Sequence, residues 1–124
     1  MDLSIFIVSY NTRQITLECL ASVYEETHGI DFEVIVVDND SSDGTAELVE
    51  YEFPQHRLLR AGANLGFAAA NNLGARQARG RWLMFLNPDT RVVGDALGRL
   101  CEVATEQPAV GVVGPRLLSA DGTP

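Results

Sequence analysis

The chain has 124 residues, of which 46% are hydrophobic, so it can form one small domain with a packed core and is not expected to be disordered. Its nine basic residues are all arginine and are outnumbered by seventeen acidic residues, which gives a formal charge of −8. This balance argues against nucleic-acid binding, which depends on a basic surface that neutralises phosphates. An anionic small molecule remains compatible with the charge if a divalent cation offsets the local field.

The sequence lacks the features of a secreted or membrane-spanning protein. Residues 1–4 carry no basic segment of a signal peptide, and no apolar run approaches the roughly 18 residues that span a bilayer. Cys19 and Cys101 lie in helical patterns without the paired spacing of a zinc site or a disulfide framework, so we expect two buried, reduced thiols. These features predict a cytoplasmic protein, either free or peripheral at the inner face of the membrane.

Strands and helices are predicted to alternate along the chain. Apolar runs predict strands at 3–8, 34–37, 57–60, 82–86 and 110–115, with the strand at 57–60 short and near an edge of the sheet. Helices are predicted from the cap residue Asn11 to Gly29, at 45–51, at 64–79 with Gly80 as a left-handed stop, and at 96–105. This alternation predicts an α/β fold with a mainly parallel sheet and right-handed crossovers.

Residues 82–90 combine a run of five large apolar side chains with a polar turn. Five consecutive apolar residues suit a central strand that helices cover on both faces. Asp89 then follows at the carboxyl end of the strand, where ligands bind in open parallel sheets. Asn87, Pro88 and Asp89 are also favoured in a type I turn, so this stretch by itself fits a structural turn equally well.

Polar loops follow three of the predicted strands, at 9–11, 38–43 and 87–89. If these strands are neighbours, the loops converge on one crevice at the carboxyl edge of the sheet. Asp38 could there accept the ring N–H of a pyrimidine base. Asp89 could offer oxygen to Mg²⁺ or Mn²⁺, which proteins commonly hold through one or two carboxylates together with substrate phosphates. Such a cation would also offset the repulsion between an acidic protein and a diphosphate.

Four segments resemble, in order, the successive motifs of family 2 glycosyltransferases. They are Val8-Ser9-Tyr10-Asn11, the stretch VVDNDSSDGT at 36–45, the stretch NLGFAAANNLG at 64–74, and Leu86-Asn87-Pro88-Asp89. The resemblance covers nearly the whole chain and is closest to the rhamnosyltransferase-like branch. It implies the nucleotide-binding half of a GT-A fold, a Rossmann-like three-layer α/β/α arrangement with the strand order 3-2-1-4.

The resemblance also implies a set of site residues. Ser9, Tyr10 and Asn11 would line the base and ribose pocket, and Asp38 would bind the base. The further candidates for nucleotide-sugar binding are Asn39, Asn64, Gly66, Asn72 and Asn87. Asp89 would be the metal-binding end of the family's Asp-x-Asp motif, whose first aspartate is replaced here by Asn87. An asparagine can still hydrogen-bond the ribose, but it lends less charge to the metal.

The implied reaction is the inverting transfer of a sugar, in this branch rhamnose, from a UDP-, dTDP- or GDP-linked donor. The acceptor would be a glycan or a lipid-linked glycan in cell-envelope polysaccharide synthesis. Because family members continue to an acceptor half that supplies the general base, we expect residues 1–124 to be a single nucleotide-sugar-binding domain, truncated before that half. We expect this chain alone to contain no catalytic base and to transfer no sugar.

Two other interpretations fit parts of the same loops. Asn39, Ser41 and Asp43 are spaced like ligands of an EF-hand calcium loop, but a strand precedes them where that motif requires a helix. The stronger alternative is a non-enzymatic Rossmann-like binding or interaction module, in which the loop carboxylates are solvated turns. Nucleotide titration with and without Mn²⁺ separates this alternative from a transferase.

Overall fold

The computed structural model describes residues 1–123, which form four strands and four helices that alternate along the chain. The strands are β1 (Leu3–Ser9), β2 (Phe32–Asp38), β3 (Arg57–Arg60) and β4 (Trp82–Leu86), and the helices are α1 (Arg13–Glu26), α2 (Thr45–Glu52), α3 (Phe67–Ala75) and α4 (Ala96–Glu106). Each pair of neighbouring strands is parallel, in the order β3-β2-β1-β4. The predicted fold class and strand order are confirmed. Within residues 1–123, no helix is both long and apolar enough to cross a membrane.

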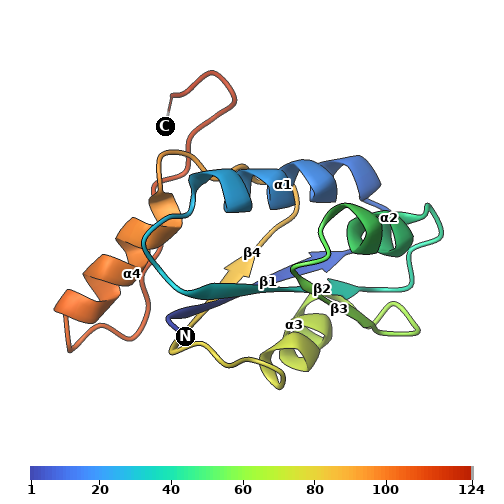
Figure 1. Ribbon diagram of the computed structural model, residues 1–124, viewed down its shortest axis with the longest axis horizontal. Helices are drawn as coiled ribbons and strands as arrows, with labels where there is room; N and C mark the ends of the chain where they lie inside the picture. Colours follow the sequence, from blue (N-terminus) through green and yellow to red (C-terminus); the bar gives the residue numbers. More distant parts are fainter. Residues whose placement is uncertain (124) are drawn as a thin grey trace.

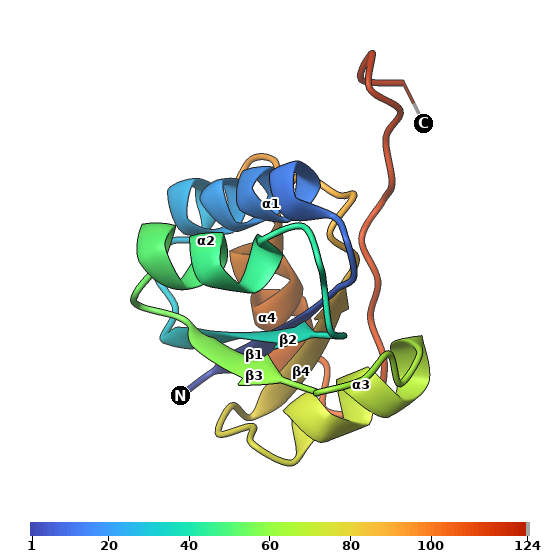
Figure 2. The same ribbon diagram turned by 90° about the vertical axis from the view of Figure 1, so that its right-hand side faces the viewer.

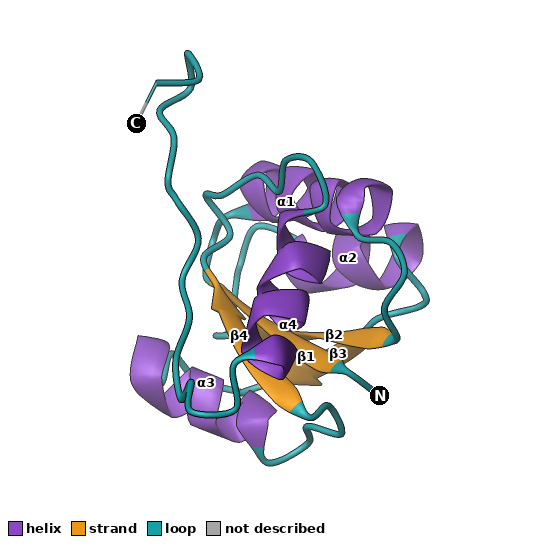
Figure 3. Ribbon diagram, turned by 90° about the vertical axis from the view of Figure 1, so that its left-hand side faces the viewer, coloured by secondary structure: helices purple, strands orange, loops and turns teal. Residues whose placement is uncertain are grey.

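Helices cover both faces of the sheet, which gives the predicted three layers. Figure 2 shows α1 and α2 on one side of the sheet and α3 on the other, and Figures 1 and 3 show α4 near β4. Alternate side chains of each strand point to opposite faces. Ile5 and Ile7 therefore join the core under α1, α2 and α4, whereas Phe6 and Val8 pack with Ala70 of α3.

Small residues, among them Ala70 and Gly74, let α3 lie close to the sheet. A Cβ atom added at Gly74 would lie 2.9 Å from the ring of Phe6 and 3.2 Å from a methyl group of Val37. The predicted end of this helix is wrong, because α3 stops at Ala75. Gly80 is not left-handed either. A side chain there would collide with the backbone of Ser4, so glycine is required for close approach to β1.

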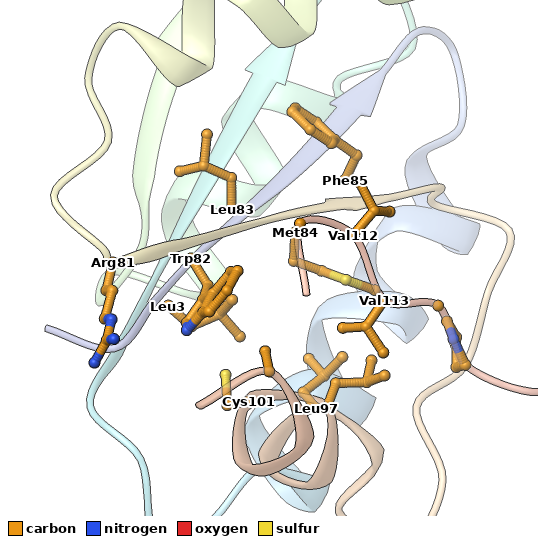
Figure 4. A pocket seen from close by; sticks show the side chains of 15 residues that line it. Leu3, Arg81, Trp82, Leu83, Met84, Phe85, Leu97, Cys101, Val112 and Val113 are labelled. Atoms are coloured by element: carbon orange, nitrogen blue, oxygen red, sulfur yellow. The ribbon is translucent and has the colours of Figure 1, made fainter. Parts of the chain in front are cut away.

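β4 lies at an edge of the sheet in residues 1–123, so its predicted central position is wrong. Its two faces differ: Trp82 and Met84 point toward α4, whereas Leu83 and Phe85 point to the opposite side (Figure 4). Leu83 is 46% exposed and Phe85 51% exposed, although the Phe85 ring stacks on Phe6 at 5.3 Å. The prediction that helices cover this strand on both faces is therefore wrong for the face of Leu83 and Phe85 in residues 1–123.

The strand predicted at 110–115 is also wrong, because this segment forms no ladder in the described part of the chain. Gly111, Gly114 and Pro115 explain the difference, since glycine weakens a strand and proline cannot donate a ladder hydrogen bond. The segment lines, with β4 and α4, an apolar cavity of about 510 Å³ (Figure 4).

The two cysteines are buried free thiols, as predicted. Burial raises the pKa of Cys19 to about 11, even though a hydrogen bond with Thr90 opposes the shift. Burial also raises the pKa of Cys101. Both side chains therefore remain neutral thiols near pH 7 and act as small apolar residues in the core.

Candidate functional site

The carboxyl ends of β1 and β2 place Ser9 beside Asp38. The two residues are partners in the parallel register, and the Ser9 hydroxyl donates to Asp38 Oδ1 at 3.0 Å. Asp38 is only 3% exposed. β4 runs along the other side of β1, with Leu86 paired to Ile7, so the strands that precede the three polar loops are adjacent. The loops therefore leave the same edge of the sheet, as the sequence predicts.

Ser41 completes the surroundings of the Asp38 carboxylate. Its backbone N–H donates to Asp38 Oδ2 at 3.0 Å, and its hydroxyl donates to Asp38 Oδ1 at 2.6 Å. The Ser41 hydroxyl in turn accepts a hydrogen bond from the backbone N–H of Asn11 at 2.9 Å. A buried carboxylate would be costly without partners, and these donors satisfy much of its hydrogen-bonding capacity.

Asn11 joins the first and second loops and does not cap α1. Its backbone has a positive φ of 50°, and its side-chain Oδ1 accepts from the backbone N–H of Ser42 at 2.8 Å. The predicted cap at Asn11 is wrong, because Thr12 occupies the cap position and makes no side-chain cap hydrogen bond. Asparagine tolerates this backbone conformation better than most residues. In it, the side-chain oxygen of Asn11 reaches the loop that follows β2.

Asp43 links the loop that follows β2 to the start of α1. Its carboxylate accepts from the backbone N–H groups of Arg13 at 3.1 Å and of Thr45 at 3.0 Å, and the Thr45 hydroxyl donates to it as well. Burial by itself would raise the pKa of Asp43, but the hydrogen bonds from Thr45 and Arg13 outweigh it and lower this pKa. The carboxylate therefore stays ionised and holds the loop in place.

Ser41 and Asp43 were not among the predicted site residues. The signal that could have identified them is the spacing Asp38-x-x-Ser41-x-Asp43 directly after a strand. Serine and aspartate in such loops commonly accept backbone N–H groups and thereby fix the loop conformation. Their partners, however, depend on the parallel register that brings the loop after β1 beside this loop.

Asn39 connects the network to the segment that precedes α3. Its side chain donates to the Gly66 carbonyl at 3.1 Å and accepts from the Leu65 backbone N–H at 3.3 Å. The Asn64 side chain accepts from the Gly66 N–H at 3.0 Å, and Gly66 has a φ of 81°, which favours glycine. The structure therefore brings the predicted residues Asn39, Asn64 and Gly66 together.

The loop after β4 is a tight turn beside this network. The backbone N–H of Thr90 donates to the Asn87 carbonyl at 3.2 Å, and the Thr90 hydroxyl donates to the same oxygen at 2.6 Å. The turn predicted from residues 87–89 is therefore confirmed. Asn87 and Asp89 are both exposed, so their side-chain oxygens are free to meet a ligand. No hydrogen bond among residues 1–123 joins this turn to Asp38.

Two further predicted residues stand outside the hydrogen-bond network in the described chain. Tyr10 follows Ser9, and its side chain is 48% exposed. Asn72 is exposed in the middle of α3. The geometry allows Tyr10 to contact a ligand at the carboxyl edge of the sheet, but it gives Asn72 no partner that would tie it to this site.

The exposed Asp89 and Asn87 oxygens fit a metal ion only if a ligand completes the coordination. Residues 1–123 contain no cluster of three or more histidine, cysteine, aspartate or glutamate side chains that could hold a metal. Mg²⁺ and its analogues are commonly held by one or two carboxylates plus substrate phosphates. A single exposed carboxylate with a neighbouring amide is compatible with that kind of shared site.

Two cavities lie away from these loops. The apolar cavity of about 510 Å³ lies along β4, and a second cavity of about 430 Å³ is lined by residues that include Asp2, His28 and Asp95. Neither is lined by residues of the Asp38 network. Among residues 1–123, Arg81 is the only charged residue that lines the apolar cavity, and four carboxylates line the second cavity, so neither suits a charged diphosphate. We therefore take the network at the carboxyl edge as the candidate site.

Comparison with known proteins confirms the resemblance seen in the motifs. The model of glycosyl transferase family 2 matches residues 4–124. The N-acetylglucosaminyl-diphospho-decaprenol L-rhamnosyltransferase of Mycobacterium tuberculosis is 31% identical over 101 residues, which cover 73% of this chain and 33% of that protein. The chain spans less than half the length of the curated relatives that it matches, with values from 26% to 49%.

Solved structures agree with this assignment. TarS 1–349 of S. aureus in complex with UDP matches with a TM-score of 0.80 and 23% identity, over 94% of this chain and 38% of that one. The mannosyltransferase PcManGT from Pyrobaculum calidifontis, in complex with GDP-Man and Mn²⁺, matches with a TM-score of 0.74 and 27% identity, over 90% of this chain and 33% of that one. The predicted GT-A architecture is confirmed, and the chain belongs to glycosyl transferase family 2.

Proposed function

We propose that residues 1–124 form the donor-binding part of an inverting glycosyltransferase, with a nucleotide-diphosphate sugar as the ligand. The observation that carries this proposal is the buried Asp38 carboxylate, fixed by Ser9 and Ser41 at the carboxyl edge of the sheet. Ligands of parallel α/β sheets bind at this edge. A buried carboxylate held at such an edge is suited to accept an N–H group of a base.

In this proposal, each loop contacts a different part of the donor. Asp38 accepts the ring N–H of the base, and Tyr10 and Asn11 line the base and ribose. Ser9 is fully buried and contributes through its hydrogen bond to Asp38. Asn87, which leaves β4 next to β1, hydrogen-bonds the ribose. Asn39 contributes by holding the segment with Asn64 and Gly66 against the site, as its two hydrogen bonds to that segment support. Asn72, which is exposed on α3, belongs to the proposed set through the family motif alone.

Asp89 and Asn87 would hold a Mg²⁺ or Mn²⁺ ion together with the diphosphate. When bound, such an ion neutralises charge that develops on the leaving diphosphate. The chain has a formal charge of −8, so a diphosphate would otherwise approach an unfavourable field. The Mn²⁺ in the mannosyltransferase complex supports this part of the proposal.

The choice of sugar and of acceptor is proposed for the whole protein. We propose rhamnose as the sugar and a glycan or lipid-linked glycan of cell-envelope polysaccharide synthesis as the acceptor. The relative from Mycobacterium tuberculosis supports both, because its name specifies an L-rhamnosyltransferase and N-acetylglucosaminyl-diphospho-decaprenol. A cytoplasmic protein, free or peripheral at the inner face of the membrane, would meet such an acceptor.

A thermal-shift panel tests the proposal. The chain is heated with UDP-glucose, dTDP-rhamnose or GDP-mannose, each with Mn²⁺ or with EDTA, and with glucose 1-phosphate as a control that lacks a base. A ligand that binds the native state stabilises it by mass action. We expect at least one nucleotide sugar with Mn²⁺ to raise Tm and the control to leave it unchanged. If none of the nucleotide sugars raises Tm, the proposed function is wrong.

A further inference from the structure

The hydrogen bonds around Asp38 leave its carboxylate with little free acceptor capacity. An ionised carboxylate has about four lone-pair positions. The hydroxyls of Ser9, at 3.0 Å, and of Ser41, at 2.6 Å, both donate to Oδ1. The Ser41 backbone N–H takes one position on Oδ2 at 3.0 Å. Among the partners that residues 1–123 provide, Oδ1 is therefore filled, and Oδ2 keeps a single free position.

The direction of the Ser41 hydroxyl is determined by Asn11. The Asn11 backbone N–H donates to the Ser41 oxygen at 2.9 Å, so the Ser41 proton points to its other close neighbour, Asp38 Oδ1. Ser9 is buried with 0% exposure, so water does not compete for its hydroxyl. Both donors on Oδ1 are thus held in place before any ligand arrives.

The bases of common sugar nucleotides differ in what they present to such a carboxylate. Uracil and thymine each carry one imide N–H between two carbonyl oxygens. Guanine presents two adjacent donors, the ring N–H and the exocyclic amino group, which together match both oxygens of a free carboxylate. Cytosine presents an exocyclic amino donor beside a ring nitrogen lone pair, and a carboxylate repels that lone pair. A buried donor that finds no acceptor loses its hydration without compensation.

We propose that Ser9 and Ser41 are positioning residues that make this site selective for a nucleoside diphosphate with an imide base, uracil or thymine, over guanine. Uracil or thymine fills the single free position on Oδ2. Guanine would place its second donor against Oδ1, which the two serine hydroxyls already fill. This inference rests on the proposed function and narrows its donor class. The complexes with UDP and with GDP-Man among the structural neighbours leave the choice of base open.

Isothermal titration of the chain with UDP, dTDP, GDP and CDP, each in Mg²⁺, tests the selectivity. One unpaired donor corresponds to about a tenfold or greater loss of affinity. We therefore expect UDP and dTDP to bind at least about tenfold more tightly than GDP and CDP. If GDP binds as tightly as UDP, the inference is wrong while the proposed function stands. If no nucleotide binds to the folded chain, both are wrong.

Variants at the two serines test the cause of the selectivity. Ser41→Ala removes one donor from Oδ1, so UDP should bind more weakly and the ratio of the GDP and UDP dissociation constants should fall by about threefold or more. Ser41→Thr keeps the hydroxyl and should retain the wild-type ratio. Ser9→Ala should lower the ratio in the same way, and it decides the question if Ser41→Ala does not fold.

Ser4→Ala is the matched control. Ser4 is a buried serine on the same strand, and its hydroxyl also donates to a carboxylate, Glu33 Oε1, at 2.6 Å. It lies at the opposite end of β1 from Ser9, so its loss should lower stability without changing the ratio. An unchanged ratio in both Ser9→Ala and Ser41→Ala, or an equal change in Ser4→Ala, would overturn the assignment to these serines.

Discussion

Ser9 and Asp38, which are 29 residues apart in the sequence, are register partners at the last position of the β1–β2 ladder, and their side chains form a buried hydrogen bond of 3.0 Å. The parallel pairing of two apolar strands thus places the Ser9 hydroxyl next to the Asp38 carboxylate. Core packing sets that pairing, because a one-residue slip would turn every side chain of a strand to the opposite face. The position of the candidate site is therefore tied to the stability of the sheet.

Asp38→Ala should weaken binding of a nucleoside diphosphate. Loss of a charge-assisted hydrogen bond in a buried site costs about 1–3 kcal/mol, which is roughly a 5- to 150-fold increase in Kd. Isothermal titration with UDP and Mg²⁺ measures the change. Asp31→Ala is the matched control, since it removes the same charge from an exposed residue at the amino end of β2. Equal affinity of the Asp38 variant and the wild type would remove Asp38 from the site.

Asp89→Ala should remove the dependence of donor binding on a divalent cation. The wild type should bind UDP more tightly with Mn²⁺ than with EDTA, whereas the variant should show the same Kd in both. Uridine, which lacks phosphates, should bind the two proteins equally because it uses other loops. The exposed Asp121 provides the control, and Asp121→Ala should retain the effect of Mn²⁺. An unchanged wild-type Kd in EDTA would contradict a role for the metal.

His56 should make the fold less stable in mild acid. The ring is buried, and neither of its nitrogens has a hydrogen-bond partner in the described part of the chain. Burial lowers the pKa of His56 below its ordinary value of 6.5, although Glu50 opposes the shift. The unfolded chain therefore binds the proton first as the pH falls, so the free energy of unfolding decreases below about pH 6.5.

Urea unfolding at about pH 7.5 and pH 5.5 measures this effect. His56→Phe removes the titrating group and should reduce the loss of stability between the two pH values. His28→Phe, at an exposed histidine, should leave that loss unchanged. If the wild type and the His56 variant lose the same stability in acid, the buried ring does not contribute to the pH dependence.

Gly74→Ala should destabilise the protein although it replaces glycine inside a helix. Alanine gains up to about 1 kcal/mol in helix propensity. The added Cβ, however, would lie 2.9 Å from the Phe6 ring, and overpacking of this kind costs about 1–3 kcal/mol. We expect a net loss in urea unfolding. Gly111→Ala, where a Cβ meets no atom within 4 Å, should be close to neutral.

The strands were predictable because their apolar runs are distinct. The runs within β1 and β2 are buried throughout, and each is followed by polar residues. The first of these, Ser9 and Asp38, still belong to the strands, and the loops begin after them. The order of the strands came from the family motifs and not from the runs themselves. Trp82–Leu86 shows why: the same apolar run fits a central or an edge strand, and only its neighbours decide.

The hydrogen bonds of the candidate site were harder to predict than its residues. Asp38 could be identified from its place after a strand, but the role of Ser41 depends on Asn11, which lies 30 residues away. The sequence predicts Asn11 as a helix cap, because local spacing cannot reveal a partner in another loop. The prediction of a strand at 110–115 was wrong for a related reason, since the valines of this segment suggest a strand but its glycines and proline oppose one.

An NMR titration of the ¹⁵N-labelled chain with UDP and Mg²⁺ tests most directly whether the carboxyl edge of the sheet binds the donor. We predict that the shifted amides cluster at residues 9–11, 38–43, 64–66 and 87–90. Replacing Mg²⁺ with paramagnetic Mn²⁺ should then broaden the amides near Asp89 most strongly. Shifts confined to β4, α4 and residues 111–115, which line the apolar cavity, would contradict this site, and so would the absence of any shift at saturating UDP.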